Sequence, residues 1–299
     1  MTNTEAKKAL INYYDKENPT KADEFVYTEA LIYLIRSTKL PKYMAELAWF
    51  YSEKKLFNLE LKYLEMAAEH GFVPAMEELG YMWYYGQHGE RDYDKAFYYF
   101  SKGVEKGKGK ETLWCRFKLA DMYHFGFGVE RDDGKYEKII KAAWKEVNPP
   151  EYLNEPFPEI ALRYAQIISG KGKKAEAAKI LRKAKRFLAE RLSSDPFWGY
   201  ISVMERIVKV LYSLETFNME SADFYDLFYL TDLPGKYSFS YRRKAVTLEV
   251  TEEESEKAIR YAGKFYRSFA EFCEKAEIKG KKLTNIYDEI YDIEPVISA

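Results

Sequence analysis

The feature that most constrains the fold is an internal repeat in the first half of the chain, and a repeat of this kind must be recognised before any other element is assigned. The segment from Ala75 to Gly107 matches a second segment that begins 40 positions further on. The aligned pairs are Leu79 with Leu119, Gly80 with Ala120, Gly86 with Gly126, Asp92 with Asp132, Ala96 with Tyr136, Phe100 with Ile140, and Gly103 with Ala143. An earlier copy runs from Tyr43 to Gly71 and has a shorter connecting loop.

Each copy has the pattern of two antiparallel helices. Apolar and small residues recur every three to four positions in both halves, which is the helical period. Gly86 and Gly126 stand where the first helix must end, because glycine tolerates the left-handed conformation of a helix C-terminus. Asp92 and Asp132 stand where they can cap the second helix. A single hairpin of this size cannot bury its own apolar face, so we expect the copies to stack into a solenoid.

These residues resemble the Sel-one-like repeat family, a branch of the tetratricopeptide superfamily. The motif is carried by Ala75, Leu79, Gly80, Gly86, Asp92, Ala96, Gly103 and Gly107. The resemblance extends over residues 43–147, about a third of the chain, and the third copy departs from the motif at Ala120, Tyr136 and Val147. It implies a right-handed superhelix of helical hairpins that acts as an adaptor or scaffold, with no cofactor and no catalytic residue.

The repeats divide the chain into three predicted regions. Residues 1–42 are expected to form N-terminal capping helices, at 5–14 and 21–38, ahead of the repeats at 43–147. Prolines at 149 and 150 mark the boundary of a mostly helical C-terminal region, 148–299. That region is expected to contain a tetratricopeptide-like hairpin at 161–192, a helix at 196–214 and a short helix at 221–230.

Residues 237–250 have a different pattern. Tyr237, Phe239 and Tyr241 alternate with polar residues, and Val246, Leu248 and Val250 do the same, so the period of two predicts a β hairpin. Thr251 and Glu254 have the spacing of a capping box, which predicts a helix from there to about residue 277. A short helix is expected within residues 283–293. The predicted fold is therefore an all-α, right-handed α-solenoid with a small β hairpin near 237–250.

Composition and charge exclude several classes of function. The 47 Lys and Arg nearly balance the 48 Asp and Glu, so the chain as a whole does not attract nucleic acid or anionic membranes. No run of 18 apolar residues is present, and the N-terminal residues lack the apolar stretch of a signal peptide. Cys115 and Cys273 are far apart, as expected for free thiols in a reducing compartment. We expect a cytoplasmic protein without a membrane span.

No residue set specifies a reaction. His70, His88 and His124 have no metal-binding spacing, and we expect His88 and His124 on surface loops. The Gly- and Lys-rich segments 103–110 and 169–174 lack the spacing of a phosphate-binding loop, so we interpret them as turns that end helices. We therefore expect no metal, no cofactor and no enzymatic activity. A catalytic site built from carboxylates in residues 150–299 stays open, because paired carboxylates leave no sequence signature.

The best functional lead is a stripe of aromatic and acidic residues on the first helix of each hairpin. In tetratricopeptide-type arrays this helix lines the concave groove. The positions expected to face a partner are Trp49, Glu53, Glu77, Glu78, Tyr81, Tyr84, Tyr85, Phe117, Asp121, His124 and Phe125. Aromatic anchors surrounded by acids suit a peptide or helix that carries Lys or Arg.

The sequence thus predicts a protein-interaction scaffold that binds a partner segment in this groove. An inhibitor or immunity-type protein is an alternative, since it needs only an extended surface. A nucleic-acid-contacting repeat protein is another, because Lys171–Arg191 holds nine basic residues against two acids. The partner, the pathway, the oligomeric state and the role of residues 215–299 are left open.

Overall fold

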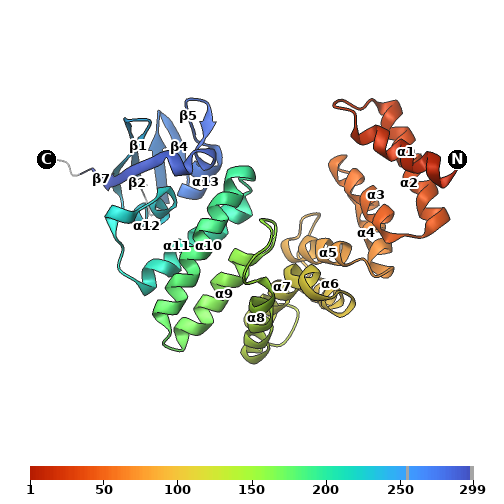
Figure 1. Ribbon diagram of the computed structural model, residues 1–299, viewed down its shortest axis with the longest axis horizontal. Helices are drawn as coiled ribbons and strands as arrows, with labels where there is room; N and C mark the ends of the chain where they lie inside the picture. Colours follow the sequence, from red (N-terminus) through yellow and green to blue (C-terminus); the bar gives the residue numbers. More distant parts are fainter. Residues whose placement is uncertain (254–255, 297–299) are drawn as a thin grey trace. The chain divides into compact units, whose positions relative to one another are not determined.

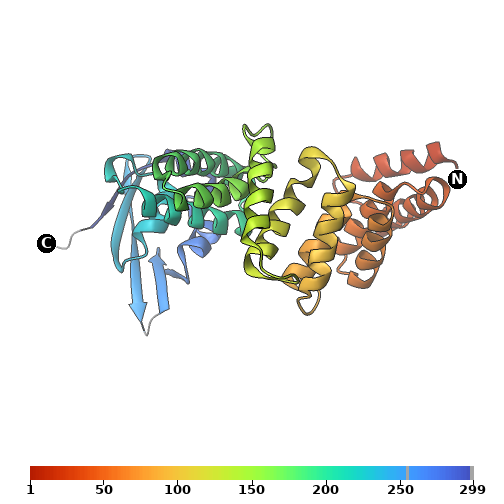
Figure 2. The same ribbon diagram turned by 90° about the horizontal axis from the view of Figure 1, so that it is seen from below.

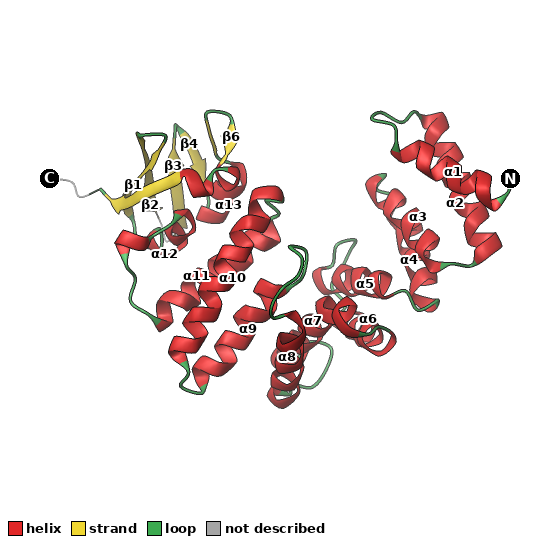
Figure 3. Ribbon diagram, in the orientation of Figure 1, coloured by secondary structure: helices red, strands yellow, loops and turns green. Residues whose placement is uncertain are grey.

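The computed structural model describes residues 1–253 and 256–296. The chain divides into two compact units, Met1–Glu146 and Val147–Ala299. The first is built from helices, and the second combines helices with a small sheet (Figures 1 and 3).

Successive antiparallel helices make up the first unit (Figure 2). They are α1 (Asn3–Tyr14), α2 (Lys21–Thr38), α3 (Pro41–Glu53), α4 (Phe57–Glu69), α5 (Val73–Tyr85), α6 (Tyr93–Lys106), α7 (Leu113–Phe125) and α8 (Asp133–Val147), with a 3-10 turn, η1, at Gly109–Thr112. The two helices predicted ahead of the repeats are present as α1 and α2. Each begins with a capping box, formed by Thr2 with Glu5 and by Thr20 with Asp23.

The predicted turn chemistry of the repeats is confirmed. Gly86 and Gly126 end α5 and α7 in the left-handed conformation, with φ of 66° and 72°. Asp92 accepts a hydrogen bond of 2.9 Å from the backbone N–H of Lys95 at the start of α6. Asp132 accepts an equivalent bond of 2.9 Å at the start of α8. The glycine and the aspartate at equivalent positions therefore end one helix and cap the next in the same way in both copies.

Small residues allow the paired helices to approach closely. A Cβ atom added to Gly80 of α5 would lie 2.5 Å from the ring of Phe100 on α6, and one added to Gly103 would lie 2.6 Å from Sγ of Cys115. In the third copy the positions of Gly80 and Phe100 are taken by Ala120 and Ile140, and both are fully buried. In the third copy a larger residue thus replaces the glycine and a smaller one replaces the phenylalanine, and both positions stay buried.

Consecutive copies also meet through a loop. Gly128, in the connection between α7 and α8, has φ of 64°, and an added Cβ would lie 2.2 Å from the backbone oxygen of Tyr93 in α6. The neighbouring Phe127 ring stacks on the Tyr93 ring with centroids 4.5 Å apart. The loop of the third copy is therefore packed against the second helix of the copy before it.

In the second unit, three helices lead into a small sheet. The helices are α9 (Phe157–Gly170), α10 (Lys174–Ser194) and α11 (Trp198–Leu214), as the sequence predicts for 161–192 and 196–214. The short helix predicted at 221–230 is made of 3-10 turns, η2 (Met219–Ser221) and η3 (Phe224–Asp226), followed by α12 (Leu227–Leu230). Together these elements carry the chain from the helices to the first strand.

The predicted β hairpin is present and belongs to a larger antiparallel sheet. Its strands are β1 (Gly235–Tyr241), β2 (Lys244–Glu253), β3 (Glu256–Tyr261), β4 (Lys264–Tyr266) and β7 (Ile290–Pro295), in the order β4-β3-β2-β1-β7. A second, two-stranded sheet joins β5 (Glu277–Ile278) to β6 (Lys281–Lys282). Tyr237, Phe239 and Tyr241 are buried. Their alternation with polar residues therefore reflects a strand with one face of the sheet covered.

Two tight turns of the sheet have unusual backbone. Arg242 and Arg243 join β1 to β2 with φ of 48° and 60°, while Ala262 and Gly263 join β3 to β4 with φ of 50° and 77°. Such turns favour Asn or Gly, because both central residues have positive φ. The first turn therefore holds two arginines in a conformation that is costly for them.

The helix predicted from Thr251 to about residue 277 is wrong. Thr251 lies in β2 and Glu254 lies outside the described residues. Among the residues of this segment that the structure describes, the α-helix is α13 (Phe269–Lys275). The turn at Ala262 and Gly263 interrupts the segment, and the flanking residues pair as strands. The helix predicted within 283–293 is also wrong. There, two 3-10 turns, η4 (Leu283–Asn285) and η5 (Tyr287–Glu289), precede β7.

Candidate partner-binding surface

The predicted partner-binding residues differ widely in exposure. Four are exposed: Trp49, Glu53, Tyr85 and Phe125. Five are half-buried: Glu77, Glu78, Tyr81, Tyr84 and His124. The remaining two, Phe117 and Asp121 on α7, are buried, with 3% and 6% of their surface exposed. In this structure the accessible part of the predicted set therefore consists mainly of residues on α3 and α5 and at the end of α7.

Four of these aromatic residues come together around one lysine. The Nζ atom of Lys118, on α7, lies 4.5 Å from the ring centroid of Tyr84, 4.8 Å from that of Tyr85 and 5.3 Å from that of Tyr81. Phe117 contributes a fourth ring at 5.6 Å. The Nζ atom also donates a hydrogen bond of 2.7 Å to Oη of Tyr85. We call Tyr81, Tyr84, Tyr85 and Phe117 the aromatic box, and Lys118 occupies it.

The sequence reasoning missed Lys118. Its side chain is buried, with only 7% of the residue exposed. Lysine is seldom buried, so composition gave no reason to select it. Lys118 follows Phe117 directly in the sequence, and this position could have indicated its role. A lysine next to an aromatic stripe can place its ammonium group over the rings.

Two half-buried carboxyl groups, those of Glu77 and Glu78, lie on α5. Within residues 1–253 and 256–296, neither side chain has a hydrogen bond or an ion pair. Burial and the neighbouring charge of Glu78 raise the pKa of Glu77 to about 8. Burial, followed by the charge of Glu60, also raises the pKa of Glu78, and His88 partly opposes this. A positive charge brought close to α5 would therefore favour ionisation of both carboxyl groups.

Both histidines predicted on surface loops contact carboxylates, but His124 lies in the last turn of α7 and not on a loop. Nε2 of His88 lies 3.1 Å from the buried carboxylate of Glu60, and its ring stacks on Phe57 with centroids 4.0 Å apart. Nδ1 of His124 lies 2.6 Å from the carboxylate of Asp133. Among the residues that the structure describes, no group of three or more His, Cys, Asp or Glu side chains could hold a metal ion.

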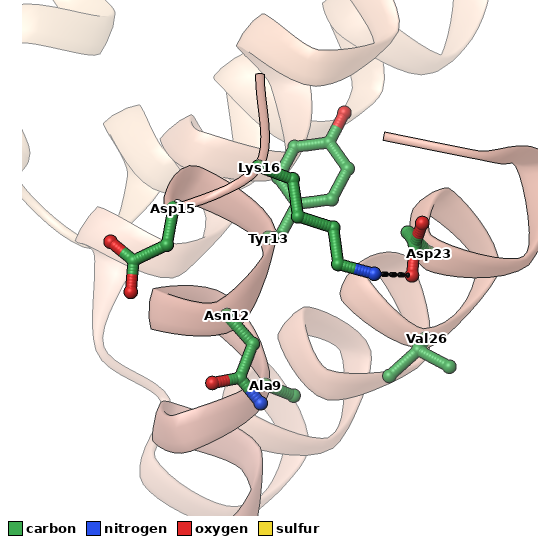
Figure 4. Close-up of a pocket in the computed structure, with 7 residues that line it drawn as sticks. All are labelled: Ala9, Asn12, Tyr13, Asp15, Lys16, Asp23 and Val26. Atoms are coloured by element: carbon green, nitrogen blue, oxygen red, sulfur yellow. Dashed lines mark hydrogen bonds and ion pairs between the residues drawn. The ribbon is translucent and has the colours of Figure 1, made fainter. Parts of the chain in front are cut away.

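A cavity of about 400 Å³ lies between α1 and α2 (Figure 4). Lys16 reaches across it to Asp23, with Nζ 2.5 Å from the carboxylate. The other lining residues are Ala9, Asn12, Tyr13, Asp15 and Val26. The sequence offered no signal for it, because these residues have the ordinary pattern of a solvent-facing helix pair.

The second unit contains a smaller cavity and a buried ionic cluster. The cavity, of about 180 Å³, lies among residues of α11, α12, α13 and the sheet, including Glu205, Asp232 and Arg267. In the cluster, Lys185 pairs with Asp226 and, at 2.8 Å, with Asp223. Tyr212 donates a hydrogen bond of 2.8 Å to the Asp226 carboxylate.

This cluster changes the interpretation of Lys171–Arg191. Two of the nine basic residues are buried: Lys185 in the ionic cluster, and Arg191 at 3.3 Å from Glu159. Lys173 pairs with Glu176 at 3.1 Å. The segment therefore offers fewer accessible cations than its sequence indicates.

No helix of the described residues combines the length and apolar character that crossing a membrane would need.

Comparison with known proteins identifies the repeats. The family model described as "Sel1 repeat" matches residues 61–72, 73–108 and 115–135. A search of curated proteins finds no match. Among solved structures, a Sel1 repeat protein from Oxalobacter formigenes is 16% identical, with a TM-score of 0.47, over 71% of this chain and 79% of that one.

A second solved structure is a protective antigen of uropathogenic Escherichia coli strains, which displays an SLR fold. It is 17% identical, with a TM-score of 0.33, over 71% of this chain and 55% of that one. Proteins with Sel1 repeats generally mediate interactions between proteins, and the family is typically non-enzymatic. The matched family model, together with the turn and cap residues of α5–α8, confirms the resemblance: this chain contains Sel1-like repeats within residues 61–135.

Proposed function

We propose that this protein is an interaction scaffold whose first helices bind a partner segment rich in Lys or Arg. The observation that carries the proposal is the pair of half-buried carboxylates, Glu77 and Glu78, that have no hydrogen bond or ion pair within the described residues. Burial without a partner keeps a proton on Glu77, whose pKa is about 8, and a cation from outside would stabilise the ionised form of either carboxyl group. The surface is therefore better satisfied with a basic partner than without one.

The surroundings of the two carboxylates support the same partner chemistry. Glu77, Tyr81 and Tyr85 are spaced four residues apart on α5, so they lie along one face of the helix. Tyr85 is 41% exposed. Large aromatic side chains beside desolvated charges are typical of the residues that dominate binding energy.

The alternative of nucleic-acid binding through Lys171–Arg191 has less support, because Lys185 and Arg191 are buried in ion pairs. An enzyme in the second unit has no support beyond the ionic cluster, in which Lys185 neutralises the acids. An inhibitor or immunity-type protein would be a special case of the scaffold, with the target as its partner.

The test is a comparison of captured proteins between variants. The double substitution Glu77→Gln and Glu78→Gln replaces both ionisable carboxyl groups with neutral amides while keeping the size of the side chains. The matched control, Glu17→Gln with Glu69→Gln, removes two charges from exposed positions of the same unit. Immobilised wild type and both variants are exposed to the native cell extract, and retained proteins are quantified by mass spectrometry.

We expect at least one protein to be retained by the wild type and the control but lost from the Glu77/Glu78 variant. Its binding segment should contain Lys or Arg. If all three baits retain the same proteins in the same amounts, the carboxylates do not take part in binding and the proposal is wrong.

A further inference from the structure

The aromatic box has the composition of a site that recognises an organic cation. Four rings surround the Nζ atom of Lys118, with centroids 4.5 to 5.6 Å away. Cages of aromatic rings at this distance are used by proteins to hold alkylammonium groups, because the negative faces of the rings attract the cation. Here the occupant belongs to the chain itself.

The box is held in shape by contacts other than those of Lys118. Tyr81 packs edge-on against Phe100, with centroids 5.4 Å apart. Tyr84 contacts the rings of Tyr93 and Phe127 at 5.5 Å and 6.2 Å. Because these contacts fix the rings, we expect the box to persist when the lysine leaves it.

The Lys118 side chain can move out of the aromatic box more easily than the four rings can. Lysine carries its charge on a flexible four-carbon stem with several rotatable bonds, so the ammonium group can move without movement of α7. The Tyr85 side of the box is its accessible side, since Tyr85 is 41% exposed whereas Phe117 is 3% exposed. A cation arriving from solvent would meet Tyr85 first.

We propose that the aromatic box is an alkylammonium site masked by Lys118, and that a lysine side chain of the partner displaces Lys118 from it. This rests on the proposed function, which supplies a basic partner. Glu77 precedes Tyr81 by one helical turn, so a partner with two cations can engage the Glu77 carboxyl group and the box together. Lys118 then acts as an internal competitor that weakens the binding of segments with only one cation.

The box itself is tested without any partner. The substitution Lys118→Ala empties it, while Lys118→Met keeps it filled with an uncharged side chain. We expect tetramethylammonium chloride to raise the midpoint of thermal unfolding of the Lys118→Ala variant in a saturable way, at millimolar concentrations typical of so small a ligand. Sodium chloride at equal ionic strength and tert-butanol, an uncharged analogue, should not do so. Wild type and the Lys118→Met variant should not respond to tetramethylammonium.

A response of the Lys118→Ala variant that is no larger than that of the wild type would show that the rings do not form a cation site. An equal response to tert-butanol would show an apolar cavity instead. Either result overturns the proposal and leaves the role of Glu77 and Glu78 untouched.

The displacement is tested on the wild type, which also covers the case in which the Lys118→Ala variant does not fold. Acetylation of lysines by a soluble reagent is followed by mass spectrometry, with the exposed Lys62 as internal reference. The probe is an N-acetylated hexapeptide of trimethyl-lysine, which has no amine to consume the reagent. We expect Lys118 to react slowly in the free protein and about tenfold faster when the probe saturates it, as loss of a cation–π contact of this size implies.

Binding of the probe without any change at Lys118 would overturn the displacement. Failure of the probe to bind would instead count against the basic partner, and so against the proposed function. The two failures are therefore distinguishable.

Discussion

The contact between Gly80 and Phe100 makes a quantitative prediction, because the chain carries its own alternative solution. A methyl group added at Gly80 would lie 2.5, 2.6 and 2.8 Å from three ring atoms of Phe100. Carbon atoms prefer separations of about 3.5–4.0 Å, so the ring must move by about 1 Å. Phe100 is fully buried, and its displacement should cost about 1–3 kcal/mol. The gain in helix propensity from Gly to Ala returns about 1 kcal/mol.

We therefore expect Gly80→Ala to lower the free energy of unfolding by up to about 2 kcal/mol. The third copy has Ala120 and Ile140 at the equivalent positions, both fully buried. Combining Gly80→Ala with Phe100→Ile should thus restore the fit, with a coupling energy of about 1–3 kcal/mol between the two substitutions. Phe100→Ile alone should be destabilising, because it leaves a cavity beside Gly80.

The measurement is urea denaturation of the wild type, both single variants and the double variant, followed by far-ultraviolet circular dichroism. Gly170→Ala in α9 is the control, since no atom lies within 4 Å of the added methyl group. It should raise stability by up to about 1 kcal/mol. If Gly80→Ala costs as much with Ile at position 100 as with Phe, the two residues are not coupled and the reasoning from the repeat is refuted.

Three further substitutions test a charge and two turns. Glu77→Gln should become more stable than the wild type as the pH rises. The folded-state pKa of Glu77, about 8, lies above the ordinary value of 4.5, so the native carboxyl holds a proton that the unfolded chain releases, and wild-type stability is lost between these two values. With about 1.4 kcal/mol for each pH unit of difference, we expect an advantage of at least ~2 kcal/mol at pH 9 and none at pH 4 in urea titrations, whereas Glu69→Gln should show no such trend. Arg243→Gly should raise the midpoint of thermal unfolding, because a non-glycine residue at a φ of 60° costs of order 1 kcal/mol. Gly263→Arg, at the equivalent position of the β3–β4 turn, should lower it, and an unchanged midpoint in both variants would show that the turns carry no strain.

The solenoid could be predicted because its determinants are local and repeated. Gly86 and Asp92 fix where one helix ends and the next begins, and Gly126 and Asp132 repeat the same signals. Comparison of the copies reveals such signals within a single sequence. The predicted β hairpin was also a local signal, since its strands are adjacent along the chain and alternate with a period of two.

The rest of the sheet could not be predicted, because its pairing is not local. Ile286, Ile290 and Ile293 are spaced like one face of a helix, yet Ile290 pairs with Tyr241 about 50 positions earlier in the chain. The segment after Thr251 has a capping-box spacing that the strand pairing of β2 with β3 overrides. In both segments, pairing with a distant or neighbouring strand determined the structure. The residue pattern of one segment alone does not reveal such pairing.

The candidate site, like the fold, could be predicted only in part from the sequence. The sequence pattern selected the tyrosines of α5, because their helical spacing is visible. Whether they surround a cation depended on Lys118, which is 33 positions from Tyr85 and lies on another helix. The partner-binding role of Trp49, Glu53 and the other predicted residues stays a prediction until the capture experiment is done.

The packing of Gly128 against Tyr93 has a consequence for how the array opens. In a linear array, cooperativity depends on the strength of each interface between neighbours. A loop that reaches back to the preceding copy adds backbone contact to one such interface, so the second and third copies should open as a single unit. The connection between α3 and α4 spans only residues 54–56, which shortens the reach of the first copy. Local unfolding of the array should therefore begin on the N-terminal side. A bound partner that contacts both α3 and α5 would stabilise the array there.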